Sequence, residues 1–298
     1  MWWTPPLAPR QALDVEARQI EDRLGLAPIV SLSDHDSIDA PMQLQALGRC
    51  GAIPVSVEWA VPFRDTYFHE GIHNLPSCRA EAGMEEMARY TAAARARALP
   101  EMMASFHGDP ECLIVLNHPF WDQPKIGEGL HEARLLEFVD RFRPWIHALE
   151  INGLRDWREN RLTIALSKRC AVPLISGGDR HGREPNATLN LTNATTFGEI
   201  AREVRRGRSQ VVLIPQYRGP LGLRIIENFT EIVSEAPDHG LGWTHWTQRV
   251  FRRCDDGHVR SLHTMCKAKP PMTLRAVTST FRMLSHRRIR PALGWAMP

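Results

Sequence analysis

The stretch Ile29-Val30-Ser31-Leu32-Ser33-Asp34-His35-Asp36 joins a β-prone run to carboxylate and imidazole side chains that bind divalent metal ions well. The same pattern occurs again later in the chain, where Ile53–Val57 precedes Glu58, Leu113–Leu116 precedes Asn117 and His118, Ile146–Leu149 precedes Glu150 and Asn152, and Val172–Ser176 precedes Asp179 and His181. In a parallel β/α barrel, the C-terminal ends of the strands converge on one mouth. The sequence therefore predicts an α/β barrel with a metal site at its mouth.

Helical patterns lie between these runs, where β/α crossovers require them. Their residues are good helix formers, and glycine or proline marks several of their ends. The predicted helices are Arg10–Leu24 capped by Gly25, Arg79–Ala98 ended by Pro100, Leu130–Phe142, Trp157–Lys168, and Phe197–Arg206, which leads into a strand at Val211–Ile214.

The five strand ends also resemble the motifs of one protein superfamily, PHP (polymerase and histidinol phosphatase). Ser33–Asp36 resembles its Thr-Asp-His motif, and Val57-Glu58 resembles Gly-x-Glu. Asn117–Pro119 is similar to Ala/Ser-His-Pro, Leu149–Asn152 to the Leu-Glu-Ile-Asn strand, and Gly178–His181 to Gly-Ser-Asp-x-His. Order and spacing agree over about residues 10 to 215.

The resemblance implies a distorted (β/α)7 TIM-like barrel that hydrolyses a phosphate ester of a small metabolite or nucleotide. Its cofactors would be Mn²⁺, Zn²⁺ or Fe²⁺, about two or three ions in an intact site. Within Phe68–His73 we choose His73 as a ligand, with His69 as the alternative. The expected metal ligands are His35, Glu58, His73, His118, Asp179 and His181.

Roles around the metals follow from side-chain chemistry. Glu58 and Asp179 are suited to bridging, because a carboxylate can offer one oxygen to each of two ions, and Arg180 is expected to contact the phosphate. Several further arginines either assist it or form ordinary surface ion pairs. The supporting residues are Asp34, His69, Glu150, Asn152, Arg155, Arg158 and Arg183.

One feature of the PHP pattern is missing. Such proteins open with a strand that carries a His-x-His pair, whereas this chain begins Met1–Pro6 and passes almost directly into the helix from Arg10. Two explanations are open: an N-terminally shortened version of a longer protein, which we favour, or a member that has lost part of its site. Without the pair, one or two metals lose ligands.

Composition suggests two parts within 298 residues: a barrel over 1–218 and a basic, mainly helical extension over 219–298. The formal net charge is only +3, yet the residues from Arg249 onward are strongly basic. Apolar residues at helical spacing predict an amphipathic helix over Met272–Arg288. Its basic face is either a solvated surface packed across the barrel or a contact for nucleic acid or an anionic membrane.

The remaining sequence features limit the location and class of the protein. No apolar stretch approaches the roughly 20 residues of a membrane span. The six cysteines lack Cys-x-x-Cys spacing, which suggests a reducing cytoplasm. Beside the phosphoesterase we keep two alternatives, an amidohydrolase-like metal hydrolase and a non-catalytic nucleic-acid-binding protein on a degenerate barrel. The oligomeric state is not predicted.

Overall fold

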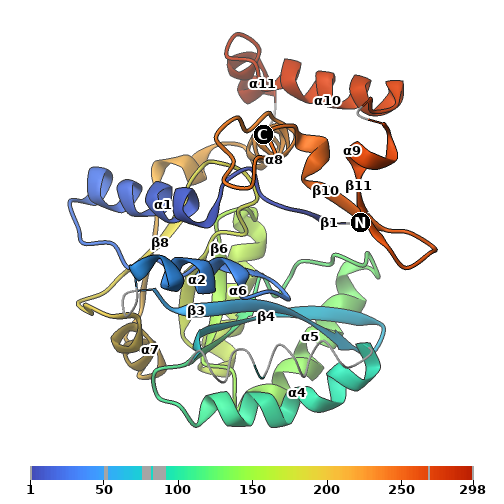
Figure 1. Cartoon of the computed structure of the whole chain (residues 1–298). Helices are drawn as coiled ribbons and strands as arrows, with labels where there is room; N and C mark the ends of the chain where they lie inside the picture. The colour runs from blue at the N-terminus through green and yellow to red at the C-terminus, as the bar shows by residue number, and fades with distance from the viewer. Residues whose placement is uncertain (1, 50–52, 76–81, 83–91, 268, 297–298) are drawn as a thin grey trace.

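The centre of the molecule is a curved six-stranded mixed sheet, seen in the computed structural model of Figure 1. The structure describes residues 2–49, 53–75, 82, 92–267 and 269–296. The strands lie in chain order: β2 (Ser33–His35), β3 (Val55–Phe63), β4 (Thr66–Leu75), β5 (Leu113–Asn117), β6 (Ala148–Asn152) and β7 (Leu174–Gly177).

The sheet is parallel except for β4, which runs antiparallel to both β3 and β5. The expectation of a parallel, distorted TIM-like barrel is therefore met in part: the curved sheet is mostly parallel, and β4 departs from it. Strand β3 continues to Phe63 and turns back through Arg64 and Asp65, with Arg64 in the left-handed region at φ 57°. A turn this short joins antiparallel strands, because a parallel connection needs a crossover of a dozen residues or more.

Helices cover the sheet on its convex side and around its ends (Figure 1). Helix α1 ends as expected, with Gly25 in the left-handed conformation at φ 63°. The helices of this part are α1 (Pro9–Leu24), α2 (Asp39–Leu44) continued by a π-helical turn at Gln45–Arg49, α4 (Ala92–His107), α5 (Glu128–Phe142), α6 (Trp157–Cys170) and α7 (Phe197–Arg205).

Helix α4 continues through Pro100, so the expected helix end there is wrong; residues 79–81 and 83–91 of that expectation lie outside the described residues. An interior proline costs about 3 kcal/mol. Leu99, Met103 and Phe106 around it are almost fully buried beneath the sheet. Each such burial contributes about 1.5–3 kcal/mol, which offsets the cost.

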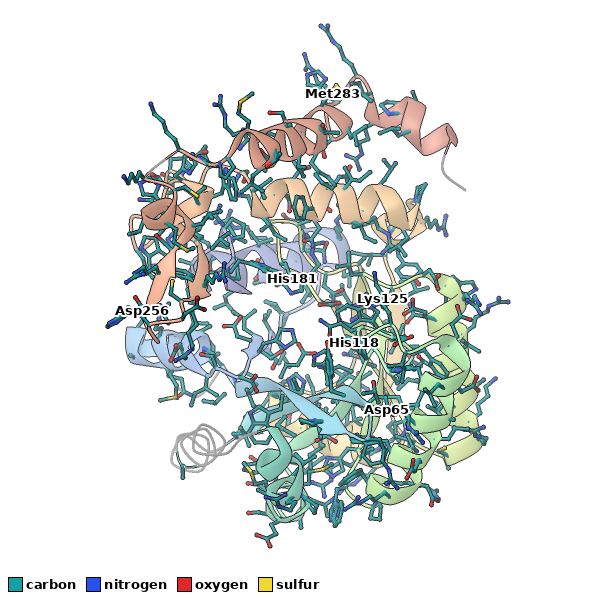
Figure 2. All side chains as sticks on the ribbon, turned by 90° about the vertical axis from the view of Figure 1, so that its right-hand side faces the viewer. Asp65, His118, Lys125, His181, Asp256 and Met283 are labelled. Carbon is teal, nitrogen blue, oxygen red and sulfur yellow. The ribbon has the colours of Figure 1, made fainter. Side chains whose placement is uncertain are left out.

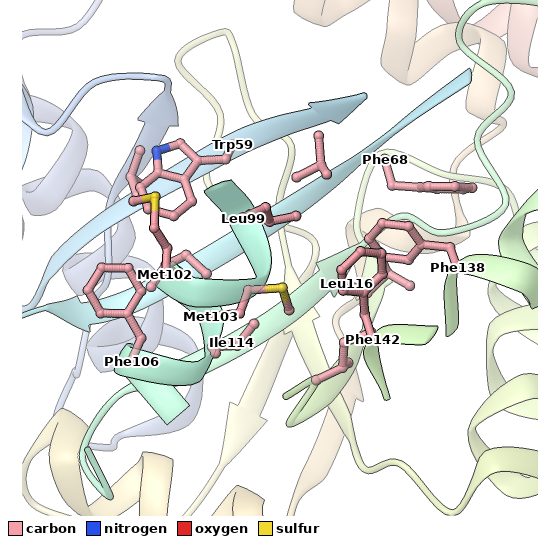
Figure 3. Packing of buried hydrophobic residues seen from close by; sticks show 14 of the residues in the cluster. Trp59, Phe68, Leu99, Met102, Met103, Phe106, Ile114, Leu116, Phe138 and Phe142 are labelled. Carbon is pink, nitrogen blue, oxygen red and sulfur yellow. The ribbon is translucent and has the colours of Figure 1, made fainter. Parts of the chain in front are cut away.

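The main core fills the space between the sheet and helices α4 and α5 (Figure 3). Trp59 of β3 lies against Phe106 of α4 with 5.9 Å between ring centroids. Phe68 of β4 packs on Phe138 of α5 at 4.7 Å. These residues alternate along their strands with polar residues on the opposite, concave face.

The first strand of the chain is not part of this sheet. Strand β1 (Trp2–Trp3) pairs antiparallel with β10 (Val250–Arg253), which pairs with β11 (Val259–Ser261). Among the described strands, β2 forms one edge of the central sheet and β7 forms the other. Beyond β7 at the other end lies a separate antiparallel pair, β8 (Thr188–Leu191) and β9 (Gln210–Leu213).

The C-terminal part stacks helices on the remainder of the fold. The expected basic helix exists as α10 (Met272–Leu284), four residues shorter than the expected 272–288. It packs on α8 (Leu221–Ile232) through Phe281 and Phe229, whose rings lie 4.4 Å apart. The shorter elements of the C-terminal part are 3-10 turns at Pro215–Arg218 and Trp246–Gln248, α9 (Leu262–Met265) and α11 (Arg290–Ala296).

Among the described residues, no helix is both long and apolar enough to cross a bilayer. The boundary near residue 218 stays a prediction. Residues on both sides of it are joined, since β1 pairs with β10 and Gln11 Nε2 donates to Asp238 O at 3.3 Å.

Candidate metal centre

Three side chains from neighbouring strands meet on the concave face of the sheet. One ligand atom each from Glu58, His69 and His118 lies within 4.8 Å of the other two, and all three residues are buried. His118 Nε2 is 3.2 Å from Glu58 Oε1, and the His69 and His118 rings are 4.9 Å apart. Figure 2 shows His118 in the interior of the molecule. A carboxylate with two imidazoles is a donor set suited to a transition metal.

The reversed direction of β4 determines which of its histidines joins this cluster. His69 is paired with Asn117, at the end of β5 where His118 follows, whereas His73 is paired with Leu113 at the start of β5. Four residues along a strand correspond to roughly 13 Å. The structure thus brings His69, the alternative of the sequence analysis, into the cluster.

His73 lies toward the start of β5, outside the group of three. Its Nδ1 is 2.9 Å from Ser31 Oγ, which is 2.8 Å from Ser56 Oγ, and its ring stacks near Phe197. Burial lowers its pKa to about 4. Gly71 makes room for this ring, because a Cβ there would lie 2.8 Å from His73 Nε2.

His35 at the end of β2 reaches the cluster from its open side. Its Nε2 is 3.5 Å from Glu58 Oε2, its ring is 5.0 Å from that of His69, and its side chain is 45% exposed. Asp34 precedes it on the edge strand and forms a bridge with Ser37. Burial raises the pKa of Asp34, opposed by the charge of His35.

The electrostatics of the cluster favour an ionised glutamate and a neutral His69. Burial opposes ionisation of Glu58, but the hydrogen bond to His118 and the nearby imidazoles outweigh it and lower its pKa. Burial, reinforced by His118, lowers the pKa of His69 to about 3. Burial works against protonation of His118 too, but the bond to Glu58 and the surrounding carboxylates raise its pKa. A neutral imidazole keeps the lone pair that a metal needs.

Glu150 supports the backbone at His118. His118 has φ 28°, a left-handed conformation that non-glycine residues rarely adopt. Its N–H donates to Glu150 Oε2 at 2.8 Å, and Asn152 Nδ2 donates to the same oxygen at 2.9 Å. Asn152 is itself held, since its Oδ1 accepts from Leu154 N at 2.7 Å. Glu150 and Asn152 therefore position the strand end that carries His118.

Gly177 is required for this arrangement, because a Cβ at that position would lie 1.5 Å from Glu150 Oε1. We expect Gly177→Ala to displace Glu150, to destabilise the protein by about 1–3 kcal/mol, and to weaken metal binding by about 10- to 100-fold. Denaturant unfolding and a metal titration measure the two effects. Gly129→Ala in α5 is the control, since no atom lies within 4 Å of a Cβ there. Equal behaviour of the two variants would contradict this role for Gly177.

Asp179 lies beside the cluster in a buried ion pair. Its Oδ2 accepts from Arg155 Nη2, and the side chains are 6% and 13% exposed. The guanidinium carbon of Arg155 lies 3.7 Å above the Trp121 ring centroid, and the Trp121 ring is 5.0 Å from His118. Asp179 has φ 49°, the second left-handed residue among the expected ligands. Its charge contributes to the raised pKa of His118.

His181 is turned toward the backbone and the N-terminal strand. Its Nδ1 is 3.0 Å from Asp179 O and 3.6 Å from Asp179 Oδ1, while its ring lies 5.5 Å from that of Trp3. The backbone N–H of His181 donates to Asn228 Oδ1 of α8 at 3.4 Å. Figure 2 places it between His118 and the C-terminal helices in that view.

The other expected phosphate-binding arginines point away from the cluster. Arg180 Nη1 donates to Pro185 O at 2.8 Å, and its guanidinium lies within 4.0 Å of Glu184 and Glu231. It lines a separate cavity of about 310 Å³ between α8, α11 and the loops after β6 and β7. Arg183 Nη2 donates to Glu235 O. Arg158 forms an exposed pair with Glu128.

Two residues at the cluster were given no role from the sequence. Asn117 Nδ2 donates to Glu58 Oε1 at 3.0 Å and so helps to orient the carboxylate. Trp121 lies between the two histidines and Arg155, with its ring 5.9 Å from that of His69. Asn117 had a signal, since it precedes His118 in a strand-end motif; Trp121 stands in a loop without one.

The chain was compared with known proteins in sequence and in structure. No protein-family model and no curated protein matches its sequence. One similar structure is an amidohydrolase from Chromobacterium violaceum with bound sulfate and no metal, with 15% identity, TM-score 0.44, and coverage of 70% of this chain and 94% of that chain. Another is a proposed metal-dependent phosphoesterase from Bifidobacterium adolescentis, with 13% identity, TM-score 0.35, and coverage of 66% and 90%. Because both TM-scores are low, the function below rests on the site itself.

Proposed function

We propose that this protein is a metal-dependent hydrolase that cleaves a phosphate ester of a small metabolite or nucleotide. The observation that carries the proposal is the convergence of Glu58, His69 and His118 within 4.8 Å, with His35 3.5 Å from the same carboxylate. Buried imidazoles beside an ionised carboxylate are typical of metal centres. The PHP-like motifs point to the same chemistry.

The residues present fit a transition metal. His69 is held neutral by burial, Glu58 is ionised, and Asn117 fixes one oxygen of that carboxylate. Glu58, His69 and His118, with His35, would hold Mn²⁺, Zn²⁺ or Fe²⁺. When bound, such an ion lowers the pKa of a coordinated water and offsets negative charge on a phosphate.

Arg155 is the cation that we assign to the phosphate, in place of Arg180. The positive charge of Arg155 helps to lower the pKa of His69, so the two side chains are close. The aromatic face of Trp121 fixes the guanidinium plane of Arg155. Its Nε–H is buried and has no hydrogen-bond partner in the described part of the chain. Arginine suits such a role because its planar fork matches phosphate oxygens.

A second candidate is hydrolysis of an amide or carboxylic ester. The observation in its favour is the ion pair of Arg155 with Asp179, which cancels the positive charge beside the cluster and so suits a neutral substrate. The same metal chemistry can polarise a carbonyl group. Turnover of an aryl phosphate compared with an aryl acetate and an anilide decides between the two.

Metal content tests the proposal directly. We expect purified protein, stripped by a chelator and then reconstituted with Mn²⁺ or Zn²⁺, to retain about one to two ions per chain, because one carboxylate and three imidazoles meet at the cluster. Elemental analysis after gel filtration measures the content. Aryl phosphate hydrolysis should appear only in the reconstituted sample. If no transition metal is retained after reconstitution, the proposal fails.

A further inference from the structure

A second candidate site lies in the C-terminal part, on the β10–β11 ribbon. A groove of about 330 Å³ opens beside these strands, within the range of roughly 300–1,000 Å³ that small-ligand sites occupy. It combines aromatic, hydroxyl and cationic side chains, and none of the described residues that line it is acidic. The lining residues are Trp243, Gln248, Phe251, Val259, Arg260, Ser261, His263 and Thr264.

The aromatic part of the groove is a fixed platform. The Trp243 indole stacks on His239 with ring centroids 5.6 Å apart and is inclined against Phe251 at 5.3 Å. Trp243 is half-buried, so its ring is anchored on one side and still contributes to the groove wall. An aromatic face held in this way is suited to stack a planar base.

One arginine, Arg260, lines this groove, and a second, Arg253, lies on the strand beside it. The register pairs Arg253 with Val259 and Phe251 with Ser261, so Arg253 projects from the same face of the ribbon as the groove. Arg252 and Arg260 are paired directly across the ribbon, one residue out of phase with Arg253, and Arg260 also lines the groove. Arg260 pairs with Asp256, but both side chains are about half exposed, so a phosphate could exchange for the carboxylate.

We propose that this groove binds single-stranded nucleic acid, with a base stacked on Trp243 and the backbone phosphates contacted by Arg253 and Arg260. The charge supports this choice, because the chain from residue 249 onward carries many arginines and lysines, against only Asp255 and Asp256. Stacking and phosphate contacts are tolerant of base identity. DNA and RNA share this chemistry, and the test separates them.

The test measures anisotropy of fluorescein-labelled oligo(dT) and oligo(U) of about 15 nucleotides with the full chain in chelator, which removes any hydrolase activity. Binding should weaken between about 50 mM and about 200 mM salt, with a logarithmic slope of about −0.7 for each phosphate contacted. Arg253→Glu with Arg260→Glu should lower affinity by about 10-fold or more. The matched control, Arg287→Glu with Arg288→Glu, changes the same charge on exposed residues outside the groove and should lower it by about 3-fold at most.

Variants of Trp243 distinguish binding in the groove from non-specific electrostatic binding to the basic surface. Trp243→Leu should weaken binding by about 10-fold or more without changing the salt slope, whereas Trp243→Phe keeps an aromatic face and should retain most of the affinity. Thermal melting confirms that each variant is folded. The proposal is overturned by no binding at low salt, by equal losses in the two double variants, by unchanged affinity of Trp243→Leu, or by binding to phosphatidylserine vesicles but not to oligonucleotides.

Discussion

Replacing Glu58 with glutamine should reduce metal-dependent hydrolysis by about 10³-fold or more. Glu58 is within hydrogen-bonding distance of His118 and 3.5 Å from His35, so its negative charge is the part of the donor set that all the imidazoles share. Without this charge the ion is bound weakly and its effect on a coordinated water is lost. Initial rates on an aryl phosphate, together with the metal content, measure the change.

Glu70 provides a matched control on the adjacent strand. Glu70 is also a fully buried carboxyl, but it faces the apolar core beside Trp59, and burial raises its pKa to about 8. At neutral pH it is protonated, so Glu70→Gln is close to isosteric and isoelectronic. We expect Glu70→Gln to keep its turnover and metal content. Loss of activity in both variants would mean that Glu58 acts through the stability of the sheet.

A core substitution completes the comparison. Leu116→Ala removes a fully buried side chain on β5, directly across from Glu70, and should cost about 2–5 kcal/mol in the free energy of unfolding. Glu58→Gln changes almost no volume, but it removes the charge that binds His118. The apo-protein should therefore lose some stability at neutral pH, which the same unfolding measurement records. A Glu58→Gln variant that retained full turnover would place the reaction elsewhere in the molecule.

Removing Arg155 should have the largest effect on stability among the charged residues at the site. Arg155→Met leaves the carboxylate of Asp179 buried without its partner, because the Asp179 side chain is only 6% exposed. Breaking a buried pair from one side costs about 3–5 kcal/mol. Urea denaturation of the metal-free protein measures this cost.

A double-mutant cycle shows whether the cost arises from the unpaired charge. Arg155→Met with Asp179→Asn removes both charges, so the double variant should be more stable than the sum of the single effects implies. Arg158→Met is the exposed comparison, since its pair with Glu128 is largely in solvent and should leave the stability nearly unchanged. Additive effects in the cycle would show that Asp179 and Arg155 do not interact as the structure has them.

Much of the candidate site follows from local sequence patterns. A β-prone run followed by a carboxylate or imidazole is a local pattern, and it predicts that Glu58, His118 and Asp179 lie near one another. Helix α1 with its glycine cap and the amphipathic helix α10 were also predicted from local patterns. Periodicity and capping depend on residues a few positions apart.

Tertiary structure decided what depends on strand direction and on distant partners. A two-residue turn after Phe63 reversed β4 and so selected His69 over His73, although both histidines face the same side of one strand. Arg180 follows Asp179 directly, yet carboxylates of a distant helix and a nearby loop draw it away from the cluster. The residue types and their order therefore determined which chemistry is available, while long-range pairing and burial, which no local pattern encodes, determined which of those groups meet.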